Sequence, residues 1–177
     1  MKLQVSITAI IFILMLFMGV SNTQAQQWKV TTAADPMDGE KRAISYVMGE
    51  GLTSLDFPYS GMDSALKFYC DDSGDETIQV TYSSTINSTN DETKDGYNVV
   101  PVRIKIDNNL FDTKFIQMWG SNSMHMSRKH AERFIPRLSS GNVVMIEIKW
   151  HSEGRVIYSY DLNGYKSGMS KARSYCN

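Results

Sequence analysis

Apolar side chains recur at every second residue in several segments of this chain, and this period of two constrains the fold more than any other feature. The clearest run is Val102, Ile104 and Ile106, which alternate with Arg103 and Lys105. Because successive side chains of a β-strand point to opposite faces, the alternation predicts a strand with one buried face. Further strands are predicted at residues 28–31, 43–48, 66–70, 78–82, 115–119, 144–150 and 155–160.

About eight short strands separated by turn residues are typical of an all-β domain. The content of 42% hydrophobic and 21% charged residues is that of an ordinary folded protein, and neither an internal repeat nor a linker divides the chain. We therefore predict a mainly β fold, a single antiparallel β-sandwich or barrel-like domain, with one or two short helices.

Two segments have helical rather than strand periodicity. The first follows Ser127, a candidate helix cap, and ends at Gly141; Pro136 is expected to limit or kink it. Its apolar positions are Ala131, Phe134, Ile135 and Leu138. The second, residues 165–175, leads to Cys176 and is expected to carry that cysteine towards the body of the domain.

Residues 83–96 are strongly polar, and Ile86 is their only aliphatic residue. Burying such a segment would leave polar groups without partners, so we expect a surface loop. Asn87 begins an Asn-Ser-Thr triplet that matches a glycosylation sequon, although so short a pattern arises often by chance. Residues 49–61 are also expected to form a loop, and Pro101 is expected at the entrance of the strand at 102–106.

The first 25 residues have the pattern of a secretory signal peptide. Lys2 precedes an apolar stretch at residues 5–20, and Thr23 and Ala25 place small residues before a cleavage site. The alternative is an uncleaved membrane anchor, but the stretch is short for a spanning helix, which needs about 20 residues. We predict cleavage after Ala25, which leaves an exported β-rich domain at 26–177 with no membrane span, in the periplasm or secreted.

The chain has two cysteines, Cys70 and Cys176, and both lie in the predicted exported part. An exported pair most often forms a disulfide, and two cysteines allow a single connectivity. The closed loop of about 107 residues would stabilise the fold by roughly 4–5 kcal/mol by the chain-entropy argument. The spacing does not match a redox-active Cys-x-x-Cys pair, so we predict a structural disulfide.

The net charge and the absence of known catalytic and cofactor motifs argue against several classes of function. The formal net charge of −1 provides no electrostatic basis for binding nucleic acid or anionic lipid. The sequence contains no P-loop, dinucleotide-binding glycine pattern, zinc-binding histidine motif or nucleophile elbow. We therefore predict no cofactor, no catalytic residues and no enzymatic activity.

One cluster of soft ligands stands out, at Met124, His125 and Met126. Thioether and imidazole groups bind copper, and an exported protein can meet that metal. Methionines also fill gaps in a core or at a contact surface, and we favour this interpretation, with no metal bound. The acidic residues 71–76 lack the spacing of a calcium loop and are interpreted as a solvated turn.

Several motifs in order along the chain resemble the VasI/TagO-type periplasmic proteins associated with type VI secretion. They are residues 28–30 (WKV), 35–39 (DPMDG), 66–70 (LKFYC), 102–107 (VRIKID), 119–121 (WGS), 134–138 (FIPRL) and 160–165 (YDLNGY) followed by Cys176. The resemblance covers most of the exported part, and the ending is its most specific element. It implies an exported β-rich domain with Cys70 joined to Cys176 and an accessory rather than catalytic role.

Three functional hypotheses follow from these observations. The first is an accessory or adaptor protein that binds another envelope component, an envelope protein, through a sheet face and its flanking loops; the residues that bind this partner are not predicted. The second is a peptidoglycan-acting enzyme or an inhibitor of one, for which Asp38 and Glu40 provide paired acids. The third is a copper-binding protein that uses Met124, His125 and Met126.

Overall fold

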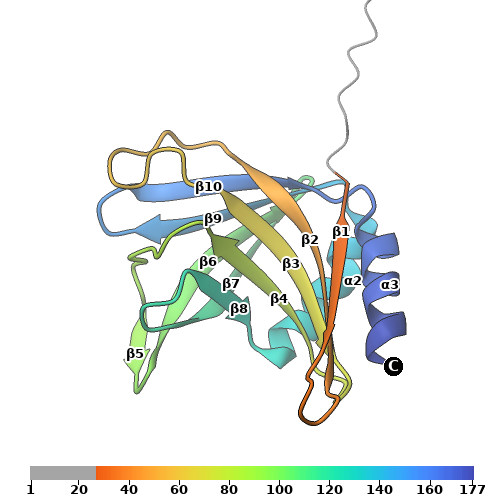
Figure 1. Cartoon of the computed structure of the whole chain (residues 1–177). Helices are drawn as coiled ribbons and strands as arrows, with labels where there is room; N and C mark the ends of the chain where they lie inside the picture. Colours follow the sequence, from red (N-terminus) through yellow and green to blue (C-terminus); the bar gives the residue numbers. More distant parts are fainter. Residues whose placement is uncertain (1–26) are drawn as a thin grey trace, which may run out of the picture.

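A computed structural model describes residues 27–177, which form ten strands and two helices (Figure 1). The predicted signal peptide at 1–25 lies outside the described residues. The strands are β1 Lys29–Ala34, β2 Lys41–Gly51, β3 Ser64–Asp71, β4 Glu76–Tyr82, β5 Glu92–Lys94, β6 Tyr97–Ile106, β7 Asn109–Met118, β8 Ser123–Met126, β9 Val143–Trp150 and β10 Gly154–Asp161. The helices are α2 Arg128–Ser140 and α3 Tyr165–Cys176.

Eight strands form a closed antiparallel barrel in the order β2-β10-β9-β6-β7-β8-β4-β3, closed by the pairing of β3 with β2. The mainly β prediction is confirmed, and the barrel-like alternative is the one the chain adopts. The closing contact between β2 and β10 is short, with Gly51 opposite Tyr158 and Glu50 opposite Ser159. β1 pairs with residues 41–46 along the rest of that edge of β2. The short β5 pairs with β6 outside the closed ring.

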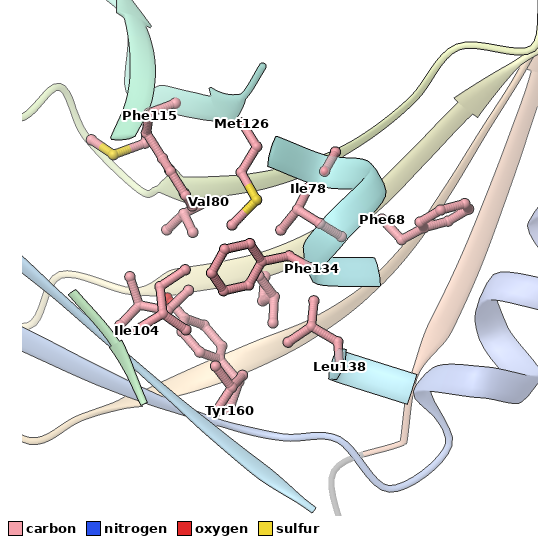
Figure 2. Close-up of a cluster of buried hydrophobic side chains, with 14 of the residues drawn as sticks. Phe68, Ile78, Val80, Ile104, Phe115, Met126, Phe134, Leu138 and Tyr160 are labelled. Atoms are coloured by element: carbon pink, nitrogen blue, oxygen red, sulfur yellow. The ribbon is translucent and has the colours of Figure 1, made fainter. Parts of the chain in front are cut away.

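The inward faces of the strands fill the barrel with aliphatic and aromatic side chains. The alternating residues thus form strands with one buried apolar face, as predicted. On β6 the predicted apolar positions Val102, Ile104 and Ile106 are all buried. Figure 2 shows Phe134 and Leu138 of α2 pointing into a cluster of side chains from the strands. The strand residues labelled in that cluster are Phe68, Ile78, Val80, Ile104, Phe115, Met126 and Tyr160.

Both helices cover the same end of the barrel. In α2 the four apolar positions at helical spacing are buried, as predicted. Ser127 precedes the helix without making a side-chain capping hydrogen bond, and Pro136 lies within the helix rather than ending it. The second helix, α3, runs beside β1 and packs against β2 (Figure 1).

A close approach between α3 and β2 requires a glycine on the helix. A Cβ atom added at Gly168 would lie 2.2 Å from the Ser45 Oγ and 3.3 Å from the Trp28 Cβ. Real Cβ atoms are not found so close to another heavy atom, so a larger residue would require the Ser45 hydroxyl to rotate away and the tight contact with Trp28 to loosen. Gly168 therefore sets the distance at which α3 covers the barrel.

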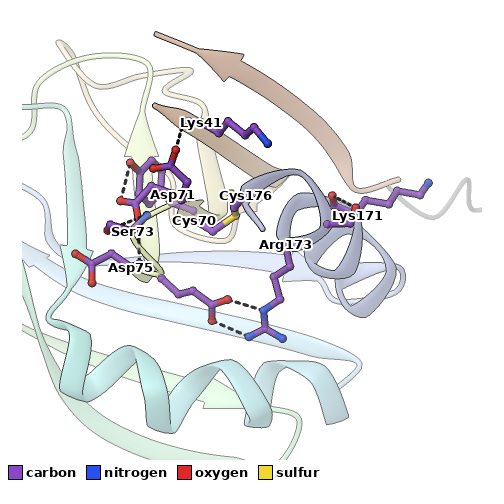
Figure 3. The surroundings of a disulfide bond; sticks show 12 residues. Lys41, Cys70, Asp71, Ser73, Asp75, Lys171, Arg173 and Cys176 are labelled. Atoms are coloured by element: carbon purple, nitrogen blue, oxygen red, sulfur yellow. Dashed lines mark hydrogen bonds and ion pairs between the residues drawn. A yellow bond between two sulfur atoms is a disulfide. The ribbon is translucent and has the colours of Figure 1, made fainter. Parts of the chain in front are cut away.

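The predicted disulfide between Cys70 and Cys176 is present and joins β3 to the last turn of α3 (Figure 3). The two Cα atoms are 6.3 Å apart, within the usual range for a disulfide. Beside it, the Arg173 guanidinium donates two hydrogen bonds to the Glu76 carboxylate, at 2.5 Å and 2.7 Å. A covalent bond and a bidentate ion pair therefore hold α3 against the barrel.

The structure corrects several predicted boundaries. β2 runs to Gly51, three residues into the predicted loop at 49–61, because its end pairs with β10. β7 begins at Asn109 rather than at 115, and β5 and β8 are not among the predicted strands. β5 and β8 span only three and four residues, too few to show a clear alternation.

Pro101 lies inside β6 rather than at its entrance. Its register partner is Lys114 of β7 on one side. On the other side, β5 pairs with β6 only as far as Val99, and β9 begins to pair at Val102. The proline thus occupies the gap between two neighbouring strands, where its missing N–H removes no ladder hydrogen bond.

Candidate functional site

The two ends of the barrel differ in what covers them. We call the end covered by α2 and α3 the helical end; it also contains the turns at 35–40 and 72–75. We call the opposite end, toward the left of Figure 1, the loop end. Strand polarity brings five connecting segments together at the loop end, residues 52–63, 83–91, 95–96, 119–122 and 151–153.

Residues 83–91 cross the mouth of the barrel at the loop end, and most of them are exposed or half-buried, as expected of the surface loop predicted at 83–96. The prediction is corrected at two points: β5 lies within that range, and two residues of the crossing segment are buried. Ile86 and Ser88 are buried, whereas Asn87 between them is exposed. The backbone is tied to the end of β9, because the His151 N–H donates to the Asn87 carbonyl at 3.0 Å. The Thr89 N–H donates to the Lys149 carbonyl at 2.7 Å. These hydrogen bonds give the polar groups of the segment the partners that they need when part of it is buried.

Gln117 of β7 organises this crossing from inside the barrel. Its side chain is buried and accepts a hydrogen bond of 2.6 Å from the Ser88 hydroxyl. Its amide nitrogen donates to the carbonyls of Ile86, at 3.2 Å, and Ser121, at 2.9 Å. One buried amide therefore fixes two loop-end segments, and its loss would leave buried carbonyls without a donor.

A pocket of about 340 Å³ opens between the crossing segment, the β7–β8 turn and the loop after β2. This volume is at the lower end of the range for small-molecule sites, about 300–1,000 Å³. No lining residue carries a formal charge at neutral pH. The lining residues are Tyr59, Thr85, Ile86, Asn87, Ser88, Asn98, Gln117, Met118, Trp119 and Gly120.

Large apolar side chains are exposed around this pocket. Trp119 on the β7–β8 turn has 58% of its surface exposed, and the neighbouring Met118 has 52%. In the loop after β2, Phe57 is 90% exposed. Two residues further on, Tyr59 packs edge-to-face on the buried Trp150, with the ring centroids 5.2 Å apart. The pocket lining thus combines the anchored ring of Tyr59 with the partly exposed ring of Trp119, and Phe57 precedes Tyr59 by two residues in the same loop.

The three copper-ligand candidates do not converge. Met124 and Met126 face the barrel interior and are almost completely buried, whereas His125 lies on the outer face. Because strand side chains alternate between faces, His125 and the two methionines cannot hold one ion together. Partial burial lowers the pKa of His125, which favours its neutral form. The methionines have the packing role that we favoured for them.

Asp38 and Glu40, the paired acids considered for a peptidoglycan-acting enzyme, lie in the turn at 35–40 at the helical end. Asp38 accepts a hydrogen bond from the Glu40 N–H at 2.9 Å, and Glu40 pairs with Arg42 at 2.7 Å. Neither carboxylate lines one of the pockets described here. Within residues 27–177, no group of three or more His, Cys, Asp or Glu side chains is placed to hold a metal ion.

A second pocket, of about 290 Å³, lies on the outer face beside His125. Its lining is charged, unlike that of the loop-end pocket. Asp75 pairs with Arg128 at 2.8 Å, and Glu76 is held by Arg173. Asp71, the third acidic residue of the lining, accepts hydrogen bonds from the N–H groups of Ser73 and Asp75. Each acidic group of this pocket therefore already has a partner within the protein, which leaves the loop-end pocket as the stronger candidate for a binding site.

Most of the loop-end pocket was not predicted from the sequence. Asn87 was singled out as part of a sequon and Trp119 as part of a resemblance motif, and both line the pocket. Tyr59, Asn98 and Gln117 were not singled out. The sequence does contain a signal for Gln117. It lies two residues after Phe115 on β7, so both side chains point to the same, buried face, and an amide at such a position is unusual.

No family model, curated protein or solved structure matches the chain. In the part of the chain that the structure describes, no helix has the length and apolar character needed to cross a membrane.

Proposed function

We propose that this protein is an exported, non-catalytic binding module that attaches to another component of the cell envelope through the loop end of its barrel. The exposed Trp119 beside the uncharged loop-end pocket is the observation that carries this proposal. Tryptophan is among the residues that contribute most to binding energy when a partner covers them.

The distribution of exposed aromatic residues supports this choice of surface. Among the exposed large hydrophobic residues of the described chain, the aromatic ones are Phe57 and Trp119, and both belong to the loop end. At the helical end the exposed apolar residues are Met37, Leu110 and Val143. Exposed aromatic rings next to a formed pocket are characteristic of a binding surface, whereas single exposed aliphatic residues are ordinary.

Export is the second part of the proposal. A cleaved signal peptide at 1–25 remains a prediction, and the Cys70–Cys176 disulfide supports it, because disulfides persist in oxidising compartments. The resemblance to VasI/TagO-type proteins, also a prediction, supports an accessory role beside a type VI secretion apparatus. With or without a role beside that apparatus, the proposed partner is an envelope component that contacts the loop end.

Site-specific photo-crosslinking in cells that export the protein tests this function. A photoreactive amino acid replaces Trp119 or Phe57 in two variants, and Met37 in a control variant that is 92% exposed at the helical end. We expect a discrete crosslinked product in the envelope fraction at the two loop-end positions and none at position 37. Absence of a product at both loop-end positions, or the same product at all three, would contradict the proposal.

A further inference from the structure

We infer that the loop-end pocket binds a neutral sugar residue. This inference rests on the proposed function and names the chemical class that the pocket recognises. A neutral sugar ring carries hydroxyl groups around its edge and an apolar C–H surface on its faces. A matching site therefore needs aromatic surface for the faces and uncharged donors and acceptors for the edge, and this pocket contains both.

The aromatic part is supplied by Trp119 and Tyr59. Trp119 exposes more than half of its surface at the pocket, so its ring is accessible to a flat apolar partner. Tyr59 is held in place by its edge-to-face contact with Trp150. A ligand that covers these rings removes apolar surface from water without a prior rearrangement of the core.

The polar part consists of amides and hydroxyls. Asn87 brings its whole side-chain amide to the pocket, and Asn98 brings its amide NH2 group, since its carbonyl oxygen accepts a hydrogen bond from the Thr93 hydroxyl at 3.2 Å. The Thr85 and Ser88 hydroxyls donate within the protein and so face the pocket as acceptors. An amide offers a donor and an acceptor side by side, which suits two neighbouring sugar hydroxyls. The lining offers no Lys or Arg to an anionic ligand, and a wholly apolar ligand would cover the Asn87 amide without giving it a partner.

The walls of the pocket are fixed before any ligand arrives. Gln117 ties together the segments that carry Ser88 and Ser121. The Thr85 hydroxyl donates to the Gly120 carbonyl at 3.3 Å, and the Trp119 N–H donates to the Gly96 carbonyl at 3.0 Å. A site fixed in this way loses little conformational entropy on binding.

The backbone pairing favours a sugar over an extended peptide. Peptides commonly bind by adding a strand to an open sheet edge. At this pocket Asn98 of β6 is paired on both sides, with Gln117 of β7 and with Thr93 of β5. The strand wall therefore offers no open edge to a peptide, and recognition depends on the side chains.

Titration of the full disulfide-bonded protein with defined oligosaccharides tests this inference. The probes are tetra-N-acetylchitotetraose, cellotetraose and maltotetraose, which are neutral, and trigalacturonate, which is anionic. We expect at least one neutral probe to bind, measured by calorimetry and by amide NMR shifts at the loop end, and trigalacturonate to bind more weakly. Trp119→Ala is expected to lower the affinity for the neutral probe about tenfold, because it removes the stacking surface.

A matched pair of charge variants sharpens the test. Asn98→Asp replaces a pocket amide by a carboxylate of the same shape and should also weaken binding. Asn108→Asp makes the same change on the exposed β6–β7 turn at the helical end and should leave binding unchanged. The inference is overturned if no neutral probe binds below about 10 mM, if trigalacturonate binds equally well, or if Trp119→Ala and Asn98→Asp both bind normally.

The crosslinking experiment separates this inference from the proposed function. If the loop-end positions crosslink to an envelope protein while no sugar binds, the sugar inference is overturned and the binding module stands. If a neutral sugar binds to the purified protein while crosslinking in cells yields no envelope product, attachment to the envelope is overturned and the sugar site stands.

Discussion

The helical end and the loop end of the barrel are held together by different kinds of interaction. At the helical end, a disulfide and the Glu76–Arg173 ion pair hold α3 on the barrel. At the loop end, the buried amide of Gln117 and the anchor residue Ile86 position segments that leave Trp119 exposed. One end is therefore built for stability, whereas the other combines fixed walls with exposed surface, which is the arrangement that recognition needs.

The largest expected effect is at the helical end. Replacing Cys70 and Cys176 by alanine, or reducing the disulfide, opens a loop whose ends are 106 residues apart in sequence. We expect the free energy of unfolding to fall by about 4–5 kcal/mol, measured by urea denaturation with and without reductant. Amide exchange should rise more in α3 than in β6 and β7, because the disulfide holds the last turn of α3.

The double variant is its own control for this prediction, because the reductant should have no further effect on it. A fall of less than about 1 kcal/mol on reduction would show that non-covalent packing alone holds α3 in place.

An intermediate effect is expected at the loop end from Gln117→Leu. The change keeps the volume of the side chain but removes its hydrogen bonds to Ser88, Ile86 and Ser121. We expect a loss of about 2–3 kcal/mol in urea denaturation, because buried carbonyls lose their donor. Amide exchange should increase at residues 83–91 and remain unchanged in α3.

Gln79→Leu is the matched control, because Gln79 lies on the outer face of β4 and its change should cost less than about 0.5 kcal/mol. Equal costs for the two variants would mean that Gln117 does not organise the loop end.

The smallest effect depends on pH and concerns Tyr165 at the helical end. Burial raises the pKa of Tyr165 above its ordinary value of 10.0, and its hydroxyl has no hydrogen-bond partner among the described residues. The unfolded chain therefore loses this proton at lower pH than the folded protein does. The stability contribution is fully present below pH 10 and declines by about 1.4 kcal/mol per pH unit above it.

Tyr165→Phe removes this dependence, so its stability should fall less steeply than that of the unmodified protein when urea denaturation is repeated between pH 9 and about pH 11. At pH 7 the two proteins should differ little. Identical slopes above pH 10 would show that Tyr165 is not protected from ionisation.

The sequence predicted best where strands are long and have one buried face. The strands around Val102, Ile146 and Val156 are present, and the apolar positions in each are buried. Prediction failed where the local pattern was short or mixed. β8 has alternating burial, but its Met-His-Met sequence also matches a soft-metal site, because methionine and histidine both bind such metals.

The loop-end pocket was harder to predict because its residues come from separate parts of the chain. Ile86 is the one aliphatic residue in a polar segment, and it proved to be the anchor that buries that segment. Its neighbour Ser88 is buried because Gln117 offers it an acceptor from a distant strand. Such a partner cannot be identified from the local sequence, so the polar composition alone indicated exposure.

The amino-acid sequence by itself determined the faces of the main strands and the pairing of Cys70 with Cys176, because alternation is local and two cysteines allow one partner each. Only the tertiary structure decided that the sheet closes into a barrel and which loops meet at its mouth. Closure depends on contacts such as Gly51 with Tyr158, which join residues far apart in sequence. Such contacts are set by strand register and packing, which no local pattern encodes.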